Sequence, residues 1–407
     1  MKNKIKMLLK IFVVVFLFGT AVSQNADSPT LPERIILNPT PDPAHEQSVT
    51  WRSLSGREKS VLHVAPAREG VDLEEYSREI GAIAERLDIP GQGPVWHYSA
   101  VIRGLTPGTK YYYRVGSGES WSEWTSFTTA EQSFEPFTFV YMGDPQLGLR
   151  TYCPRLFRQA VKTAPEARFW LFAGDQVNVG NSDNDFRDFF YAGSWMFRSI
   201  NILPVAGNHE YPRAANLITR ELTPLWRPHY TLPENGPDGL EESSYWLDYQ
   251  GVRIIILNGN EKLEEQRDWI ERLLKKNDSR WTVVAIHQPI YSTGNERDNT
   301  ELQELFLPLF DRYGVDIVLQ GHDHTYGRTY PLKAGKIAAG GEKGTVYVVS
   351  SSGAKFYSQN PLYLGLMAKT ALNTQLFQVI KAEENSLNFK AVTVNGDVID
   401  EFTIVKD

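Results

Sequence analysis

The chain has 407 residues, of which 42% are hydrophobic and 22% are charged, and its formal net charge at pH 7 is −7. This length exceeds that of one ordinary core, and the composition excludes disordered and fibrous proteins in favour of a globular protein of two domains. The mildly acidic balance, without a run of Lys or Arg, predicts no nucleic-acid-binding patch. A phosphate site in this chain would therefore take its positive charge from bound metal ions.

Residues 1–23 have the pattern of a secretory signal peptide. Four lysines between positions 2 and 10 precede an apolar run at 11–18 and small residues at 21–23, which suit cleavage before Gln24. An uncleaved membrane anchor is the alternative, but the apolar run is shorter than the roughly 20 residues that span a bilayer. We therefore predict a secreted or periplasmic protein without a transmembrane span after cleavage.

Short alternating or aromatic-rich segments, separated by turn residues, predict a small β-sandwich domain over residues 32–130. They lie at 47–51, 60–64, 98–102 and 111–115. The stretch at 104–111 and the Phe-Thr-Thr at 127–129 resemble fibronectin type III-like domains. Trp121 and Trp124 would suit sugar or peptide binding if they were exposed, but such rings more often fill or rim a sandwich.

From residue 136 to 407 the pattern changes to that of an α/β domain. Buried-type strands alternate with helical segments, so the sheet must be covered on both faces. The strands are expected at 137–142, 169–173, 202–206, 252–257, 282–286 and 317–320, and the helices at 155–162, 183–197, 262–275 and 300–313. The chain from 376 onward returns to short strands and is expected to close the edge of a sheet.

Five of these strands end in loops that begin with metal-binding residue types. The loops are Gly143-Asp144-Pro145-Gln146, Gly174-Asp175-Gln176, Gly207-Asn208-His209-Glu210, Ile286-His287-Gln288 and Gly321-His322-Asp323-His324. The carboxyl ends of strands in open α/β sheets meet at one crevice, and a glycine before the ligand allows a sharp turn. Each signal alone is weak, because Gly-Asp is most often an ordinary turn. The ordered set, in contrast, predicts one metal site.

The ligand types indicate which ions the site would bind. Carboxylate and amide oxygens together with imidazole nitrogens suit zinc, iron or manganese, and a carboxylate between two ions can bridge them. The residues that supply these atoms are Asp144, Asp175, Asn208, His287, His322 and His324. We therefore predict a binuclear centre with two divalent or mixed-valence ions.

This order of motifs resembles the calcineurin-like metallophosphoesterase superfamily, and with the preceding sandwich it resembles the purple acid phosphatase branch. The resemblance implies a four-layer α/β sandwich for the second domain. It further implies that Asp144 and His324 bind the first ion, that Asp175 bridges, and that Asn208, His287 and His322 bind the second. His209, in the Gly-Asn-His motif, would then face the substrate.

The chain departs from the family pattern at four places. Purple acid phosphatases have a tyrosine three positions after the bridging Asp, where this chain has Asn178, so we predict no purple colour and no obligatory ferric ion. Gln146 replaces a common His or Gly, the plant-type histidine pair is replaced by the loop 294–299, and Tyr-Glu-Arg becomes Tyr-Gly-Arg at 326–328. The metal core is thus retained while the substrate pocket differs. The candidate substrate contacts are Gln146, Asn178, Asn295, Arg297, Tyr326 and Arg328, since a guanidinium fork matches phosphate geometry.

The predicted function is hydrolysis of phosphate monoesters, as by an acid phosphatase, on a small phosphorylated substrate. Two ions lower the pKa of a bound water to near neutrality, so hydroxide is the expected in-line nucleophile, and His209 is the expected proton donor. A phosphodiesterase or nucleotidase that uses the same cluster is the near alternative. A non-catalytic extracytoplasmic binding protein is an alternative of another class. The sequence leaves the oligomeric state open.

Overall fold

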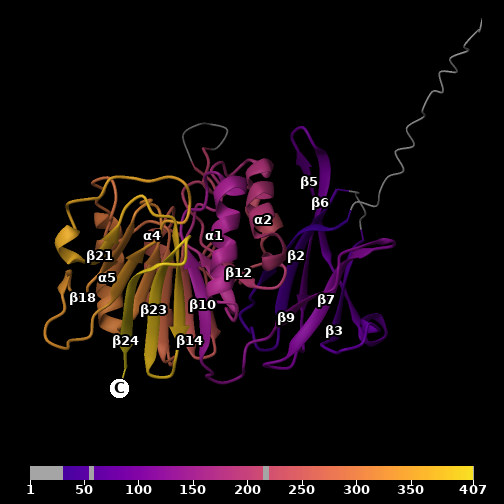
Figure 1. The fold of residues 1–407 in the computed structure, drawn as a ribbon, viewed down its shortest axis with the longest axis horizontal. Coiled ribbons are helices and arrows are strands. Elements are labelled where there is room, and N and C mark those ends of the chain that lie inside the picture. The colour runs from indigo at the N-terminus through magenta and orange to yellow at the C-terminus, as the bar shows by residue number, and fades with distance from the viewer. Residues whose placement is uncertain (1–30, 55–58, 214–219, 407) are drawn as a thin grey trace, which may run out of the picture.

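The computed structural model describes residues 31–54, 59–213 and 220–406 of the chain, and the predicted signal peptide lies outside them. Figure 1 shows two parts side by side, an all-β N-terminal part and a larger α/β part. The all-β part has two sheets. One has the order β1-β2-β6-β5, and the other has the order β4-β3-β7-β8 with β9 beside β7. The strands are β1 (Glu33–Asn38), β2 (Gln47–Ser53), β3 (Val61–Pro66), β4 (Arg78–Gly81), β5 (Ile83–Ile89), β6 (Gly93–Ile102), β7 (Lys110–Ser117), β8 (Ser120–Trp121) and β9 (Thr125–Thr128), and a 3-10 turn spans Leu73–Tyr76.

Apolar side chains from both sheets meet in a core that includes Trp51, Tyr98 and Tyr113. This is the alternation that the sequence predicts, because every second residue of a strand faces the same side. Trp121 and Trp124 are half-buried on Arg114, whose guanidinium carbon lies 4.2 Å and 5.0 Å from their rings. Their packing supports the structural alternative for these two tryptophans.

The α/β part has two mixed sheets. The six-stranded sheet has the order β12-β11-β10-β22-β23-β24, and the seven-stranded sheet has the order β13-β14-β15-β16-β20-β17-β21. The strands of the first are β10 (Phe137–Met142), β11 (Phe169–Phe172), β12 (Asn201–Pro204), β22 (Leu376–Ala382), β23 (Ser386–Thr393) and β24 (Val398–Val405). Those of the second are β13 (Tyr245–Tyr249), β14 (Val252–Leu257), β15 (Trp281–Ile286), β16 (Ile317–Gln320), β17 (Tyr326–Thr329), β20 (Val346–Val349) and β21 (Met367–Ala371), and β18 (Leu332–Lys333) pairs with β19 (Lys336–Ile337).

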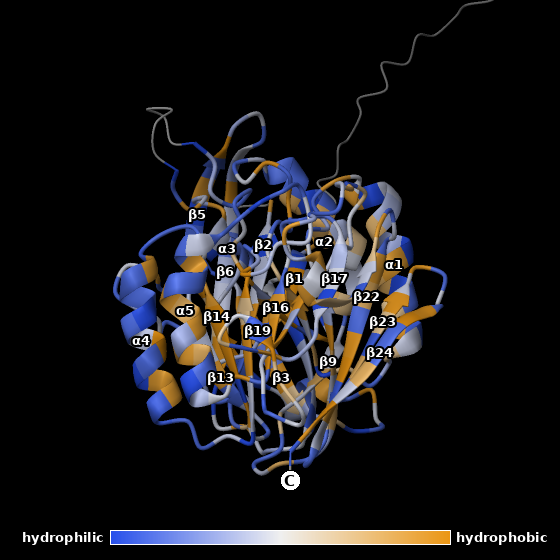
Figure 2. Ribbon diagram, turned by 90° about the vertical axis from the view of Figure 1, so that its left-hand side faces the viewer, coloured by the Kyte–Doolittle hydropathy of each residue, from blue (hydrophilic) through white to orange (hydrophobic). Residues whose placement is uncertain are grey.

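Helices cover the outer faces of the two sheets, which gives the four layers that the resemblance implies. Figure 2 shows α4 and α5 on one side and α1 on the other, with strands between them. The helices are α1 (Leu149–Thr163), α2 (Asp183–Phe197), α3 (Trp226–His229), α4 (Leu263–Lys275) and α5 (Thr300–Tyr313), and a second 3-10 turn spans Leu364–Leu366. The largest core lies between the sheets and under α1 and α2, and a second core lies beneath α4 and α5. No helix in the described ranges is both long and apolar enough to cross a membrane.

The expected elements differ from the observed ones in two respects. The first helix begins at Leu149 rather than at 155, directly after Gly148, which adopts a left-handed conformation with φ 65°. The chain from 376 does reach a sheet edge through β23 and β24, but β22 pairs with β10 inside the sheet. Apolar alternation identifies such a strand without fixing which neighbour it chooses.

The two parts of the chain are joined by buried polar contacts as well as by the linker. The guanidinium groups of Arg34 and Arg52, from β1 and β2, both bond the carboxylate of Asp183 at the start of α2, at 2.7 Å and 2.9 Å. Asn38 donates to the carbonyl oxygen of Ile202 on β12 at 2.8 Å. The β1-β2 sheet therefore lies against the β12 edge of the α/β part.

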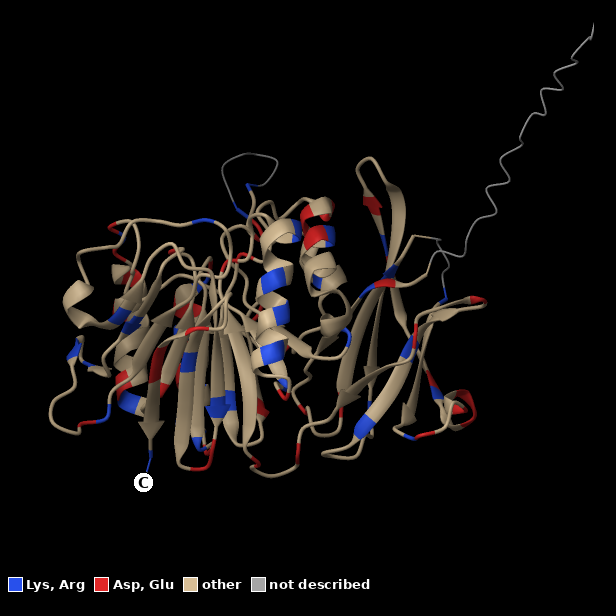
Figure 3. Ribbon diagram, in the orientation of Figure 1, with Lys and Arg blue, Asp and Glu red and all other residues tan. Residues whose placement is uncertain are grey.

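Charged residues of both signs are mixed over the ribbon in Figure 3. Basic residues along α1 lie beside the acidic first turns of α2, where Arg150 pairs with Asp188 at 2.7 Å. The excess negative charge of the sequence is thus distributed, and it does not form one block on these elements.

Candidate metal centre

The six predicted ligands follow strands of both sheets. Asp144, Asp175 and Asn208 come after β10, β11 and β12 of the six-stranded sheet. The three histidines come after β15 and β16 of the seven-stranded sheet. β10, β11 and β12 run parallel to one another, as do β14, β15 and β16, so their carboxyl ends deliver these side chains to one end of the domain.

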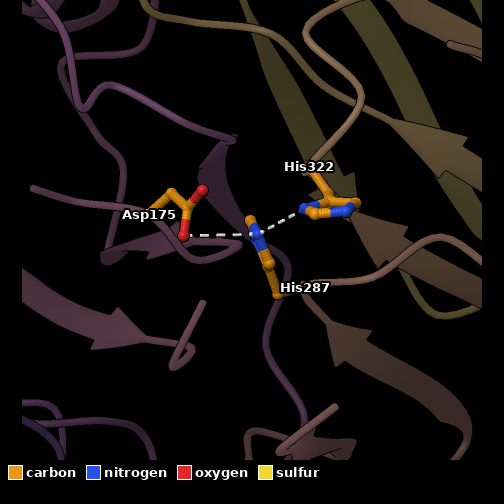
Figure 4. Close-up of side chains that lie close together, drawn as sticks. All are labelled: Asp175, His287 and His322. Carbon is orange, nitrogen blue, oxygen red and sulfur yellow. Dashed lines mark hydrogen bonds and ion pairs between the residues drawn. The ribbon is translucent and has the colours of Figure 1, made fainter. Parts of the chain in front are cut away.

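The ligand atoms assigned to the second ion converge on His287. Its Nε2 lies 3.1 Å from Nδ1 of His322, 3.1 Å from Oδ1 of Asn208 and 3.3 Å from Oδ1 of Asp175. Ligand atoms of Asp175, His287 and His322 all lie within 4.8 Å of one another (Figure 4). The structure thus places the bridging candidate among the second-ion candidates.

A backbone hydrogen bond on the side away from the cluster orients the imidazole of His287. Its Nδ1 donates to the carbonyl oxygen of Ala173 at 2.8 Å, which directs Nε2 toward the cluster. Burial alone would lower the pKa of His287, but the charge and hydrogen bond of Asp175 and the charge of Asp144 raise it to about 10. A bound cation would favour the neutral form of this ring, because an imidazole nitrogen must be unprotonated to bind a metal.

Asp144 and His324, the candidates for the first ion, have buried atoms without partners. Oδ2 of Asp144 accepts from the amide of His322 at 2.6 Å, while Oδ1 lies 3.9 Å from Nε2 of His324. Within the described part of the chain, neither this Oδ1 nor Nδ1 of His324 has a hydrogen-bond partner. Burial raises the pKa of Asp144 well above its usual range. An unpaired buried carboxylate is costly, so this pair fits a cation.

Gln146 also lies inside the cluster, as its position in the first motif predicts. Its Nε2 is 3.2 Å from Oδ2 of Asp175 and 3.1 Å from Nε2 of His324, and the residue is buried. The amide thus touches candidate ligands of both ions. Its prediction as a substrate contact stays a prediction.

Four of the six predicted ligands have a left-handed backbone, with φ of 54° at Asp144, 49° at Asp175, 74° at His322 and 51° at His324. Residues with a side chain rarely adopt this conformation, and such strain clusters at functional sites. The φ of Gly207 is not positive, so glycine at this position is explained by the space that it leaves rather than by the sharp turn that we predicted. A Cβ there would lie 2.2 Å from Oδ1 of Asp175, so glycine provides space for that carboxylate.

Glu210 supports the cluster, a role that was not predicted from the sequence. It is fully buried and its carboxylate accepts from the amides of Asp175, Gly207 and Val177 at 3.0, 2.8 and 3.3 Å. It therefore fixes the Asp175 loop to the loop that carries Asn208. The acidic residue directly after the Gly-Asn-His motif was the sequence signal that could have indicated this supporting role.

Glu210→Ala is expected to weaken metal binding about 10- to 100-fold, because residues that orient ligands have effects of this size. Titration of the metal-free protein with zinc or manganese measures this affinity. Glu265→Ala, at an exposed position of α4, is the matched control and should bind as the wild type does. Equal affinities in a folded Glu210→Ala variant would contradict the supporting role.

His209 lies at the edge of the cluster. Its amide donates to Oδ1 of Asp175 at 2.9 Å, its Nδ1 bonds the carbonyl oxygen of Asn178, and its Nε2 is 3.8 Å from Oδ2 of Asp175. The side chain is 26% exposed, so Nε2 is within reach of a molecule bound at the cluster. Asn178 meets His209 through its backbone, and its side chain is half-buried.

Arg297 and Asn295 lie in the loop after β15. Nη1 of Arg297 donates to the carbonyl oxygen of His322 at 3.0 Å and to Asp323 at 2.8 Å, which places the guanidinium beside the cluster. Asn295 is exposed, and its amide donates to the carbonyl oxygen of Ser358 at 3.1 Å. Both residues remain predicted substrate contacts.

Tyr326 and Arg328, the remaining predicted substrate contacts, both bond the carboxylate of Asp400. The hydroxyl of Tyr326 donates to Asp400 at 2.7 Å, and Nε and Nη2 of Arg328 bind both oxygens of the same carboxylate at 2.7 and 2.9 Å. Residues two apart in a strand share a face, and this face of β17 is directed toward β24. The guanidinium fork is therefore already occupied.

Comparisons with known proteins agree with this geometry. Residues 32–129 match the family described as purple acid phosphatase, N-terminal domain, and residues 137–326 match the family described as calcineurin-like phosphoesterase. The second part of the chain is therefore a calcineurin-like metallophosphoesterase domain. With the domain that precedes it, the chain belongs to the purple acid phosphatase branch of that superfamily.

Two relatives illustrate the range of similarity. Fe(3+)-Zn(2+) purple acid phosphatase 12 of Arabidopsis thaliana is 24% identical over 348 residues, which cover 78% of this chain and 73% of the relative. The uncharacterized protein Rv2577 of Mycobacterium tuberculosis is 28% identical over 272 residues, which cover 58% of this chain and 51% of the relative. The match thus spans about half the length of the mycobacterial protein.

Two solved structures share the fold. Purple acid phosphatase PPD1 from yellow lupin (Lupinus luteus) seeds superposes with a TM-score of 0.79 at 19% identity, over 93% of this chain and 75% of that one. The structure of PhoD superposes with a TM-score of 0.66 at 12% identity, over 92% and 89%. Both matches extend across the sandwich as well as the α/β domain.

Proposed function

We propose that this protein is a secreted or periplasmic phosphoesterase that hydrolyses phosphate monoesters at a centre of two iron, zinc or manganese ions. The observation that carries the proposal is the convergence of buried ligand atoms from both sheets, with Oδ1 of Asp144 unpartnered in the described residues. Asp144 and His324 would hold one ion, and Asn208, His287 and His322 the other, with Asp175 between them. When bound, such ions activate water and neutralise phosphoryl oxygens.

The residues of the chain have separate tasks in this proposal. Glu210 and the Ala173 carbonyl orient Asp175 and His287. The guanidinium of Arg297 offers donors to an anionic group of the bound substrate. His209, oriented by the Asn178 carbonyl, gives a proton from Nε2 to the leaving oxygen. A serine or cysteine nucleophile is not required.

The deciding experiment measures nitrophenolate release from nitrophenyl phosphate and from the bis-nitrophenyl diester. The protein, without its signal peptide, is reconstituted separately with zinc, manganese and iron. Faster metal-dependent turnover of the monoester is the expected result. Faster turnover of the diester would instead favour a phosphodiesterase, and no metal-dependent release from either substrate would favour a binding protein.

His209→Ala is expected to keep its metal ions and to lose turnover by about 10²- to 10⁴-fold, the contribution of a general acid. The loss should be smaller for a nitrophenyl ester than for an alkyl ester, because nitrophenolate leaves with little protonation. Metal content and the rates on both esters are the measurements. A variant that turns over at the wild-type rate would exclude the role.

The purified protein is expected to have no strong visible band even when reconstituted with iron. The tyrosine whose phenolate gives the family its colour is replaced by Asn178, and no other tyrosine is within four positions of it in the sequence. Absorption spectra of the iron-loaded protein, recorded between the yellow and red regions, measure this. A strong band there would contradict the inference and indicate that another phenolate binds the ion.

A further inference from the structure

Residues 353–360, which follow β20, form a loop beside the first-ion side of the centre. The ring of Tyr357 packs edge-on against His324, with centroids 4.8 Å apart and planes at 83°. The backbone amide of Asn360 donates to the carbonyl oxygen of Thr293 at 2.9 Å. Its side-chain amide donates to the backbone carbonyl oxygen of Arg297 at 2.8 Å. This loop is therefore fixed to the loop that carries Arg297.

Two cations lie on Tyr357. The guanidinium carbon of Arg297 is 5.3 Å from the ring centroid, and Nζ of Lys355 is 4.9 Å from it. Cations at such distances are attracted by the ring face, which holds both near His324. The ring of Tyr357 thus contacts two positively charged groups, the guanidinium of Arg297 and the ammonium of Lys355.

Arg297 is fixed but only partly used. Asp323, which is buried between His322 and His324, accepts from the Arg297 guanidinium at 2.8 Å and from the amides of Thr293 and Gly294 at 2.6 and 3.1 Å. In the described ranges, Nε and Nη2 of Arg297 have no hydrogen-bond partner. One edge of the guanidinium is therefore available to a ligand.

Lys355 has no carboxylate beside its ammonium group. Lys333, Lys381, Lys390 and Lys406 each have a carboxylate oxygen within 3.0 Å, whereas no described carboxylate lies within 4.0 Å of Lys355. The side chain of Lys355 is half-buried, so its ammonium group is only partly solvated. An uncompensated cation beside a substrate site attracts anions.

We infer that Lys355 and Arg297, held on Tyr357, form a second anion subsite that binds a further negative group of the substrate. The inference rests on the proposed function, which assigns the scissile phosphoryl group to the metal centre. The substrates selected would be phosphate esters with a second phosphate or a carboxylate near the scissile group. An ester whose only anionic group is the scissile phosphate would leave Lys355 unpaired and would gain no affinity from it.

Calorimetric titration of the metal-loaded protein tests the subsite without turnover. Methylphosphonate represents the scissile group alone, methylenediphosphonate adds a second phosphonate, and phosphonoacetate adds a carboxylate. Lys355→Gln is expected to weaken binding of one or both two-anion ligands about tenfold, the size of one hydrogen bond to a charged group, and to change methylphosphonate binding less than about twofold. Lys355→Arg should restore the selective binding. Metal content is measured after each titration, because diphosphonates chelate ions.

Lys336→Gln, at an exposed position of β19, is the matched control and should bind all three ligands as the wild type does. Selective loss for one two-anion ligand supports the subsite and identifies its anionic group. Equal weakening of all three ligands by Lys355→Gln, or no weakening, overturns the subsite while the proposed function stands. A metal-loaded wild type that does not bind methylphosphonate overturns the proposed function and the subsite with it.

Discussion

Asp175→Asn is expected to lose more than about 100-fold in turnover and to bind fewer than two ions. Outer residues that only orient ligands contribute about 10- to 100-fold, and Asp175 lies inside the cluster itself. Its Oδ1 is 3.3 Å from Nε2 of His287, a candidate ligand of the second ion, and its Oδ2 is 3.2 Å from Nε2 of Gln146, which also lies 3.1 Å from Nε2 of His324. Turnover of nitrophenyl phosphate and metal content after gel filtration measure the two effects.

Asp268→Asn, at an exposed position of α4, is the matched control for the loss of one carboxylate charge. It should keep both ions and full turnover. If Asp175→Asn kept two ions and the wild-type rate while folding normally, Asp175 would not be the bridging ligand. Loss of metal without loss of activity would place catalysis elsewhere in the molecule.

Asp183→Ala is expected to lower the free energy of unfolding by about 3–5 kcal/mol, the cost of leaving buried charges unpaired. The carboxylate accepts from Arg34 at 2.7 and 2.8 Å, from Arg52 at 2.9 Å and from Gln92 at 2.9 Å. The side chains of both arginines and of Asp183 are at most 4% exposed. Urea unfolding of the full chain, followed by fluorescence, measures the difference.

The same carboxylate predicts a loss of stability in acid. Burial opposes its ionisation, but the hydrogen bonds and charges of Arg34 and the charge of Arg52 outweigh burial and lower the pKa of Asp183 to about 2. A carboxyl whose pKa is lower in the folded state stabilises the fold above its unfolded pKa, near 4. This contribution should therefore decrease from about pH 4 to pH 2 in the wild type and be absent in Asp183→Ala. Asp88→Asn, whose side chain is 72% exposed, should unfold as the wild type does, and equal stability of the two variants would contradict the assignment.

The sequence predicts the α/β class and the positions of the six candidate ligands because both depend on local signals. A buried strand followed by glycine and a metal-binding residue is visible within about ten residues, and parallel strands bring such ends together. His287, for example, follows a fully buried strand and lies among the other candidates as expected. The assignment of each ligand to an ion remains a prediction from the resemblance.

Contacts between distant segments could not be predicted in this way. Tyr326 and Arg328, for example, bond Asp400, which follows them by more than 70 residues and lies opposite them on β24. Periodicity gives the two residues a shared face without showing what covers it. Tyr357 and Lys355 lie in a loop with no recognisable motif, so only the fold shows that they adjoin His324.

The left-handed backbone at Asp144, Asp175, His322 and His324 is expected to affect the rate and the selectivity of metal binding. Loops that are already set in this conformation by the buried strands before them do not have to be ordered when an ion arrives, so little chain entropy is lost at that step. The spacing of the ligand atoms is also set before binding, which disfavours ions that require a different coordination geometry. The rigid strands beneath the site would thus act as a template that discriminates among the metals available to the protein.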